Sequence, residues 1–230
     1  MASKMRRKRF ETIEQALRSG RGTVTVLDLG GTAQYWLTQV CLPADIDVHI
    51  TLLNLTESSV DDCRFSSVTG DARDLTTFGD ASFDIVFSNS VIEHVGNASD
   101  QQRMADEARR VGSWFYVQTP NKHFPIEPHF LFPMFQYLPR SIRIGLARTL
   151  RLGWNSRIGE RTVAEAEVDE ICLLTPRRFR ALFPGADVGF ERFFGLAKSM
   201  VATGPGWPAA SHFNAGRLPD NLGTPSYRRP

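Results

Sequence analysis

The stretch "VLDLGG", residues 26–31, is an apolar run that ends in an aspartate and two glycines. Such a run is typical of a buried strand that turns sharply into a helix, the place where open α/β sheets bind nucleotides. After Gly30 and Gly31, however, residues 32–34 are Thr-Ala-Gln, so a three-glycine fingerprint is missing. Alone, the stretch fits either a cofactor-binding loop or a tight turn, and the choice depends on the rest of the chain.

The composition predicts one globular domain, because the 230 residues are 42% hydrophobic and 23% charged. The net charge of +2 is too small to require a polyanionic partner, although residues 4–9, KMRRKR, carry five positive charges. The sequence predicts no secretory signal and no membrane span of roughly 18 apolar residues. Three widely spaced cysteines predict neither disulfides nor a cysteine zinc site and favour a cytoplasmic location; they are Cys41, Cys63 and Cys172.

Short apolar runs alternate with longer amphipathic stretches, which predicts an α/β fold with a doubly wound, mostly parallel sheet. We predict strands at residues 23–29, 47–54, 65–69, 83–89, 113–119, 187–194 and 197–203. Helices are predicted at 32–40, at 98–111 and, shorter, at 176–183. Ser99 and Gln102 have capping-box spacing at the start of the second helix. Since only the Gly195 region joins the last two strands, one strand at that edge should be antiparallel.

Three segments follow from this pattern: a basic N-terminal arm and helix at 1–22, the main domain at 23–203 and an irregular tail at 204–230. Within the main domain, residues from about 121 to 174 break the strand–helix alternation and predict a helical lid insertion. Residues 140–152 of this insertion alternate arginines with Ile and Leu. This stretch predicts either a helix packed on the domain, with its arginines in water, or peripheral contact with the inner face of a membrane.

Polar or small residues follow the ends of four predicted strands. Ligands bind at the carboxyl edge of an open α/β sheet, so these residues should surround one crevice. They are Asp28 to Gly31, Asn54, Asp71 with Ala72, and Ser88 with Asn89.

Five segments, "VLDLGG", "ITLLNL", "GDARDL", "FDIVFSNSVIEHV" and "TPN", in this order and spacing, resemble the class I S-adenosylmethionine-dependent methyltransferases. The small-molecule, methyltransferase type 11-like subgroup is the most similar. The resemblance runs from about residue 24 to 119, with a weaker extension to 203. It implies a Rossmann-like sheet of seven strands, the last one antiparallel. It also implies methyl transfer from S-adenosylmethionine to a small organic acceptor, with apolar and lipid-linked acceptors among the options.

The resemblance also implies cofactor-binding roles. Gly30 and Gly31 would let the backbone approach the methionine portion, and Asp28 would hold its ammonium group. Asn54 stands where the family usually has an acid against the ribose, so acceptance from both hydroxyls is lost. The shortened glycine pattern predicts weaker binding, unless Tyr35 and Trp36 pack beneath the turn. The remaining residues implied are Asp71 and the Ala72 amide at the adenine, Ser88 beside the amine, and Asn89 after it.

His94 and Glu93, just after the fourth predicted strand, are the candidates for a general base. Alternatively, His94 packs or caps the next segment and Glu93 is a solvated or helix-terminal carboxylate. The stretch is similar to the "ExxEH" motif that binds a divalent metal in small-RNA 2′-O-methyltransferases, but Ser90 replaces the first glutamate. His123 and His129 are potential additional ligands, yet no metal is predicted.

The segment "TPNKHFPIEPHFLFPMFQYLP", residues 119–139, combines five prolines with many aromatic side chains. We predict that it covers the acceptor, with aromatic rings around an apolar or planar part and polar groups orienting the other end. Alternatively, the aromatic residues only seal the sheet edge. The candidate acceptor residues are His123, Phe124, Glu127 and His129.

Three other functions are alternatives to methyl transfer to a small molecule. A catalytically inactive methyltransferase-fold binding or regulatory protein fits the reduced glycine pattern, and an RNA methyltransferase is supported by the basic N-terminus alone. A nucleotide-dependent oxidoreductase requires three spaced glycines and an acid at the second strand tip, and both are absent. The predicted partner is therefore a small molecule rather than a nucleic acid.

Overall fold

The computed structural model describes residues 2–20, 22–40, 42, 44–57, 59–153 and 157–206. Seven strands form one sheet in the order β3-β2-β1-β4-β5-β9-β8. This arrangement confirms the predicted doubly wound α/β fold. The strands are β1 (Val24–Leu29), β2 (Val48–Asn54), β3 (Phe65–Thr69), β4 (Phe83–Asn89), β5 (Gly112–Pro120), β8 (Asp187–Phe193) and β9 (Leu196–Pro205).

The last strand is antiparallel, as predicted. Strands β1 to β5 pair in parallel, whereas β9 pairs antiparallel with both β5 and β8. Strand β9 therefore lies between β5 and the edge strand β8. Phe194 and Gly195 join the two strands with φ angles of 47° and 81°, the left-handed conformation that tight two-residue hairpin turns require.

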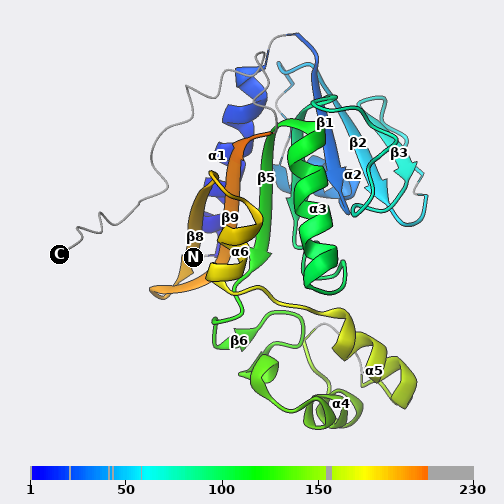
Figure 1. The fold of residues 1–230 in the computed structure, drawn as a ribbon, viewed down its shortest axis with the longest axis vertical. Helices are drawn as coiled ribbons and strands as arrows, with labels where there is room; N and C mark the ends of the chain where they lie inside the picture. Colours follow the sequence, from blue (N-terminus) through cyan, green and yellow to red (C-terminus); the bar gives the residue numbers. More distant parts are fainter. Residues whose placement is uncertain are drawn as a thin grey trace, which may run out of the picture.

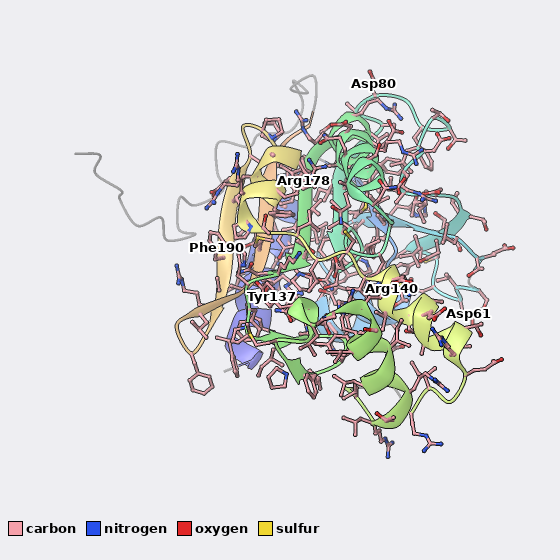
Figure 2. All side chains as sticks on the ribbon, turned by 60° about the horizontal axis from the view of Figure 1, so that its bottom comes forward. Asp61, Asp80, Tyr137, Arg140, Arg178 and Phe190 are labelled. Carbon is pink, nitrogen blue, oxygen red and sulfur yellow. The ribbon has the colours of Figure 1, made fainter. Side chains whose placement is uncertain are left out.

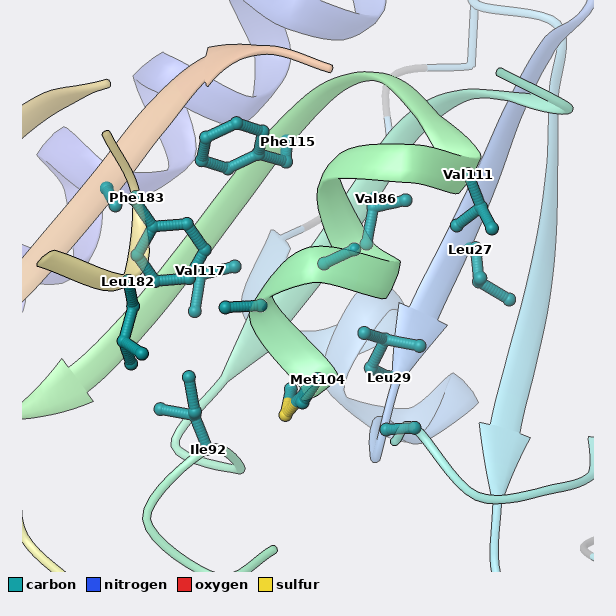
Figure 3. Close-up of a cluster of buried hydrophobic side chains, with 14 of the residues drawn as sticks. Leu27, Leu29, Val86, Ile92, Met104, Val111, Phe115, Val117, Leu182 and Phe183 are labelled. Atoms are coloured by element: carbon teal, nitrogen blue, oxygen red, sulfur yellow. The ribbon is translucent and has the colours of Figure 1, made fainter. Parts of the chain in front are cut away.

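Helices cover both faces of the sheet (Figure 1). Helices α3 (Ala98–Val111) and α6 (Pro176–Leu182) lie on one face, and α1 (Ala2–Ser19) and α2 (Ala33–Tyr35) lie on the other. Met104 and Val111 of α3 pack with Phe115 and Val117 of the sheet in the first core cluster (Figure 3). On the opposite face, Ile13, Leu17 and Trp36 pack with Trp114 and Tyr116.

Two local predictions were wrong in detail. The capping box of α3 is formed by Asn97 and Asp100, not by Ser99 and Gln102, because the extended Asn97 places its side-chain oxygen at the amides of Ser99 and Asp100. The predicted helix at 32–40 is regular only over Ala33–Tyr35 and continues as a π-helical turn over Trp36–Val40. Helix α6 begins where it was predicted, with Thr175 as the N-cap and a proline in the first turn.

The insertion after β5 lies at the carboxyl ends of the parallel strands (Figure 1). It contains β6 (Ile126–Glu127), β7 (Phe132–Pro133), a 3-10 turn at Phe135–Tyr137, α4 (Arg140–Thr149) and α5 (Arg161–Glu170). Figure 2 brings this end forward and labels Tyr137 and Arg140 on it. A separate apolar cluster stabilises it, formed by Phe130, Phe135, Ile144, Ala147, Leu152, Ala164 and Val168.

The basic amphipathic stretch packs one side against the neighbouring helix. Ile144 and Ala147 of α4 are buried, and Arg140 forms a salt bridge with Asp169 of α5. Among the described residues, no helix is both long and apolar enough to cross a membrane. Cys63 and Cys172 are free thiols, and Cys41 lies outside the described residues. The predicted tail begins within β9, which continues to Pro205, and residues 207–230 lie outside the described part.

Candidate functional site

The carboxyl ends of β1, β2 and β4 lie side by side. Leu29 of β1 pairs with Leu53 of β2 on one side and with Ser88 of β4 on the other. The strands therefore reach the same sheet edge in register. The next residue of each strand lies at this edge: Gly30, Asn54 and Asn89.

The turn after β1 has no room for side chains at its two glycines. Gly30 has a φ of +76°, and a Cβ there would lie 2.7 Å from Val91 Cγ2. A Cβ at Gly31 would overlap the Asp28 carboxylate. Asn54 Nδ2 donates a hydrogen bond to the Gly31 carbonyl oxygen over 3.0 Å, and a carboxylate at that position has no proton to donate there. Asn54 therefore stabilises the turn through this hydrogen bond.

Asp28 is buried beneath this turn. Its Oδ2 accepts a hydrogen bond from Trp36 Nε1 over 2.6 Å, while its Oδ1 has no partner. Burial raises the pKa of Asp28 to about 7, although the Trp36 bond opposes the rise. Trp36 packs edge-on against Phe87, and Tyr35 stacks on the same ring, with centroids 5.0 and 5.9 Å apart. These aromatic rings stabilise a turn that has only two glycines.

Ser88 and Asn89 differ in their surroundings. Ser88 is fully buried and its Oγ has no partner. Asn89 Oδ1 accepts a hydrogen bond from Arg9 of α1, which also binds Glu191 of β8 through Nε and Nη2 over 3.0 and 2.7 Å. Asn89 is therefore already linked to the N-terminal helix.

Asp71 follows β3 and is engaged by its neighbour Arg73. The Arg73 side chain donates to Asp71 Oδ2 from Nη2 over 2.6 Å and to both carboxylate oxygens from Nε over 2.9 Å, and the Arg73 amide donates to Oδ1 over 2.9 Å. These hydrogen bonds hold the pKa of Asp71 below its ordinary value. A carboxylate has about four acceptor sites and three Arg73 donors already bind it, so room for about one further donor remains. The Ala72 side chain packs in the core cluster that contains Leu29 and Leu53.

A second group of polar side chains lies where the segment after β4 meets the insertion. Glu93 is fully buried, and its Oε2 accepts a hydrogen bond from Thr119 Oγ1 over 2.9 Å. Glu93 Oε1 has no partner. Burial raises the pKa of Glu93 to about 7, against the opposing hydrogen bonds.

His94 faces His129 of the insertion, with the two Nε2 atoms 3.1 Å apart. His94 Nδ1 lies 3.3 Å from Glu170 Oε1, and His129 Nδ1 lies 2.6 Å from Glu127 Oε1. Burial and the charge of His129 lower the pKa of His94. Burial also acts to lower the pKa of His129, but the bond to Glu127 outweighs it and the net shift is upward. His94 is thus the more readily neutral histidine of the pair.

The four candidate acceptor residues are only partly brought together. Glu127 and His129 join His94, as described above. His123 Nδ1 instead lies 2.9 Å from the Tyr137 hydroxyl. Phe124 is buried and contacts Phe193 of β8 edge-on, with centroids 6.5 Å apart.

A model of a known protein family matches the part of the chain that contains the first four strands. Residues 16–113, which include α2, β1 to β4 and α3, match the family model described as "Methyltransferase domain". The match identifies a methyltransferase domain in this part of the chain. The matched residues include the carboxyl ends of β1 to β4 and the segment with Glu93 and His94.

Curated proteins match a short stretch of the chain. A 53-residue stretch is 38% identical to an uncharacterized protein of Mycobacterium tuberculosis, covering 23% of this chain and 18% of that protein. The aligned stretch thus spans less than a fifth of the length of those curated relatives.

Solved structures share the fold at low sequence identity. An O-methyltransferase family protein from Burkholderia thailandensis has a TM-score of 0.51 at 10% identity, covering 88% of this chain and 56% of that one. The N-terminal domain of EvdMO1, crystallised in the presence of SAH and D-fucose, scores 0.50 at 15%, covering 86% and 82%. A Rhodobacter sphaeroides protein named as a Zn-dependent alcohol dehydrogenase scores 0.54 at 13%, covering 86% and 97%. Their different names show that this likeness concerns the fold.

S-adenosylmethionine is the cofactor of this family, and the residues at the strand ends fit it. Gly30 is exposed and Gly31 is partly exposed, while a Cβ at either position would clash with Val91 or Asp28. Asp28 Oδ1 and Ser88 Oγ are buried polar atoms without partners, and such atoms are stabilised when a ligand supplies their hydrogen bonds. An ammonium group is a suitable donor to both.

A cavity of about 170 Å³ lies within the insertion of the same chain. Two side-chain atoms of its lining residues, Arg143 Nε and Gln136 Oε1, are buried without a partner, one a donor and the other an acceptor. Apolar rings of Phe130 and Phe135 complete part of the wall, and Glu127 joins the cavity to His129. The remaining lining residues are Lys122, Val168, Ile171, Cys172 and Leu173.

Sequence reasoning missed several of these residues. Gln136 carried no signal, and Arg143 was recognised only as part of the amphipathic stretch. Glu170 reaches His94 from a helix 76 positions further along the chain, and no spacing rule predicts such a contact. Thr119 was placed at a strand end, but its hydrogen bond to Glu93, which joins β5 to the segment after β4, was not predicted.

Proposed function

We propose that the chain is an S-adenosylmethionine-dependent methyltransferase that acts on a small organic acceptor with an apolar part and a polar end. The observation that carries the proposal is the side-chain-free turn at Gly30 and Gly31 above the unpartnered oxygen of Asp28. The match to the methyltransferase family over residues 16–113 supports it independently.

The proposed cofactor contacts start at the methionine end. Asp28 and Ser88 accept from the ammonium group, and the backbone of Gly30 and Gly31 lies along the methionine portion. Asn54 contributes its carbonyl oxygen to a ribose hydroxyl while its amide stays on Gly31. Asp71 and the Ala72 amide take the adenine, with Asn89 beside the amine. When bound, S-adenosylmethionine supplies a methyl group made electrophilic by its sulfonium.

The acceptor occupies the cavity in the insertion under this proposal. Phe130 and Phe135 contact its apolar part, and the unpartnered atoms of Arg143 and Gln136 bind its polar end. The volume of about 170 Å³ is smaller than the roughly 300 Å³ of typical ligand pockets, so the cavity encloses one end of an acceptor. Insertion residues His123 and Phe124 belong to the outer surroundings of that site.

His94 is the proposed general base. Its lowered pKa leaves it neutral near pH 7, so its ring can accept a proton from the acceptor. Glu93 supports the same segment through its bond to Thr119. Positioning of nucleophile, methyl carbon and sulfur on one line supplies a further 7 to 11 kcal/mol, roughly, in favourable cases.

A binding protein without turnover is the second candidate. Asp71, a proposed adenosine ligand, is already bonded within the chain to Arg73. Its engagement favours a protein with weak or absent cofactor binding. RNA is a weaker candidate for the acceptor, because Arg9 of the basic N-terminal stretch is bound to Glu191.

Calorimetric titration with S-adenosylmethionine and S-adenosylhomocysteine tests the proposal. We expect saturable one-to-one binding by the wild type and binding weakened by about 10-fold or more in Gly31→Ala, since the new Cβ overlaps Asp28. Gly79→Ala is the matched control, because nothing lies within 4 Å of a Cβ there. Absence of binding by the folded wild type to either ligand would refute the proposal.

A further inference from the structure

The two histidines of the second polar group each have a carboxylate near Nδ1, and their rings are nearly perpendicular, at 87°. His129 Nδ1 is hydrogen-bonded to Glu127 over 2.6 Å, whereas His94 Nδ1 lies 3.3 Å from Glu170 in an ion-pair contact without a hydrogen bond. Their Nε2 atoms point at one another across 3.1 Å. Histidines that bind metals are commonly held in this way, because a carboxylate on one ring nitrogen fixes the tautomer and leaves a lone pair on the other.

Glu93 adds a third potential ligand at the same place. One ligand atom from each of Glu93, His94 and His129 lies within 4.8 Å of the other two. Glu93 is fully buried, and its Oε1 has no partner because Thr119 binds only Oε2. A buried carboxylate oxygen without a partner is costly, and an adjacent cation removes that cost.

The spacing suits a first-row metal ion. Bonds of about 2.0 to 2.2 Å with angles between tetrahedral and octahedral values place neighbouring ligand atoms roughly 3.0 to 3.5 Å apart. The two Nε2 atoms already have this separation at 3.1 Å. The ligand atom of Glu93 lies within 4.8 Å of both histidine nitrogens, so a movement of its side chain toward them completes the set.

We propose that Glu93, His94 and His129 bind a divalent first-row transition metal. Two imidazoles and one carboxylate form a ligand set that suits Zn²⁺ or Fe²⁺ and leaves coordination positions open for water or a ligand oxygen. Metal binding requires neutral imidazoles and occupies the Nε2 lone pair of His94, so His94 would serve as the proposed general base only in the metal-free protein.

This site departs from the expectation drawn from the sequence. No metal was predicted, because Ser90 replaces the first glutamate of the "ExxEH" pattern. The Ser90 hydroxyl is in fact bonded to Gln118, and the second histidine comes from the insertion. Glu127, which binds His129, also lines the proposed acceptor cavity, so the metal would lie next to that cavity.

Metal binding does not rest on the proposed function, because it is measured without S-adenosylmethionine. Untagged full-length protein, stripped with a chelator, is titrated with Zn²⁺ against a chromophoric competitor. We expect one Zn²⁺ per chain in the wild type and a loss of affinity of about 100-fold or more in His94→Ala and His129→Ala. Glu170→Gln should lose up to about 10-fold, since it removes a carboxylate behind a ligand.

His123→Ala is the matched control and should keep the wild-type Zn²⁺ affinity, because His123 is paired with Tyr137 away from the cluster. Circular dichroism verifies that each variant is folded, and His94→Gln or His129→Gln replaces the corresponding alanine variant if that variant is not. Binding of Co²⁺ should give visible absorption bands in the wild type that these folded variants lack. No stoichiometric binding, or equal Zn²⁺ affinity in the wild type and the ligand variants, would overturn the proposal.

Discussion

At the scale of single residues, Asn54 shows how a departure from the family pattern can be stabilising. The sequence alone indicated a loss, because an amide accepts fewer hydrogen bonds from a ribose than a carboxylate does. In the structure, Asn54 Nδ2 donates a hydrogen bond to the Gly31 carbonyl oxygen, which a carboxylate cannot do. The asparagine and the two-glycine turn are thus complementary.

Asn54→Asp tests this account. The usual family acid should weaken S-adenosylmethionine binding by about 10-fold, because a carboxylate facing the Gly31 carbonyl loses a hydrogen bond and leaves two acceptors opposed. Calorimetry at pH 7.5 measures the change. Tighter binding by the aspartate variant would show that the ribose contact matters more than the turn.

Asp28 makes folding stability depend on pH. Burial raises its pKa to about 7 from an ordinary 3.8, so the folded protein binds a proton that the unfolded chain releases more readily. Its contribution to stability is therefore full below about pH 4 and is lost as pH rises through 7. Glu93 acts in the same direction, with its pKa raised to about 7 from 4.5.

Asp28→Asn should accordingly flatten the pH profile. The free energy of unfolding of the wild type should fall by a few kcal/mol between pH 5 and pH 8, and the variant should lose about half of that fall. Urea denaturation of the protein without cofactor at both pH values gives the comparison. The same fall in both proteins would show that the pKa of Asp28 is not raised in the folded state.

At the scale of elements, the seven strands of the main sheet and α3 were predictable within two residues of their ends, whereas β6 and β7 were not predicted. Alternation of apolar runs and amphipathic stretches is a local property, so the chain carries it without knowledge of its partners. The segment at 32–40 was less predictable, because the bond from Trp36 to Asp28 fixes where that side chain must lie. The contacts of the insertion were also hidden, because its cluster joins residues from 130 to 168.

The insertion should depend on its own apolar cluster. Ile144 of α4 is 6% exposed and Ile142, two residues earlier, is 48% exposed. Ile144→Ala should cost about 2 to 5 kcal/mol in the stability of the insertion, and Ile142→Ala about 0.5 kcal/mol or less. Hydrogen exchange of the α4 and α5 amides reports this locally. Equal protection in the two variants would mean that α4 does not pack through Ile144.

At the scale of the whole molecule, one sheet edge brings together groups from distant parts of the chain. Arg9, Asn89 and Glu191 connect α1 with β4 and β8 across separations of 80 and 182 positions. His94 and His129 join the family-matched part to the insertion in the same way. The strand ends follow from the parallel sheet and were predictable, whereas these long-range pairs depend on how the helices and the insertion pack.

We propose that the cofactor binds at the sheet edge formed by β1, β2 and β4. A crystal structure of the chain with S-adenosylhomocysteine tests this most directly. We expect the amine within hydrogen-bond distance of Asp28 or Ser88, the ribose at Asn54 and the adenine at Asp71. A ligand bound elsewhere on the chain, or no bound ligand at saturating concentration, would contradict the account.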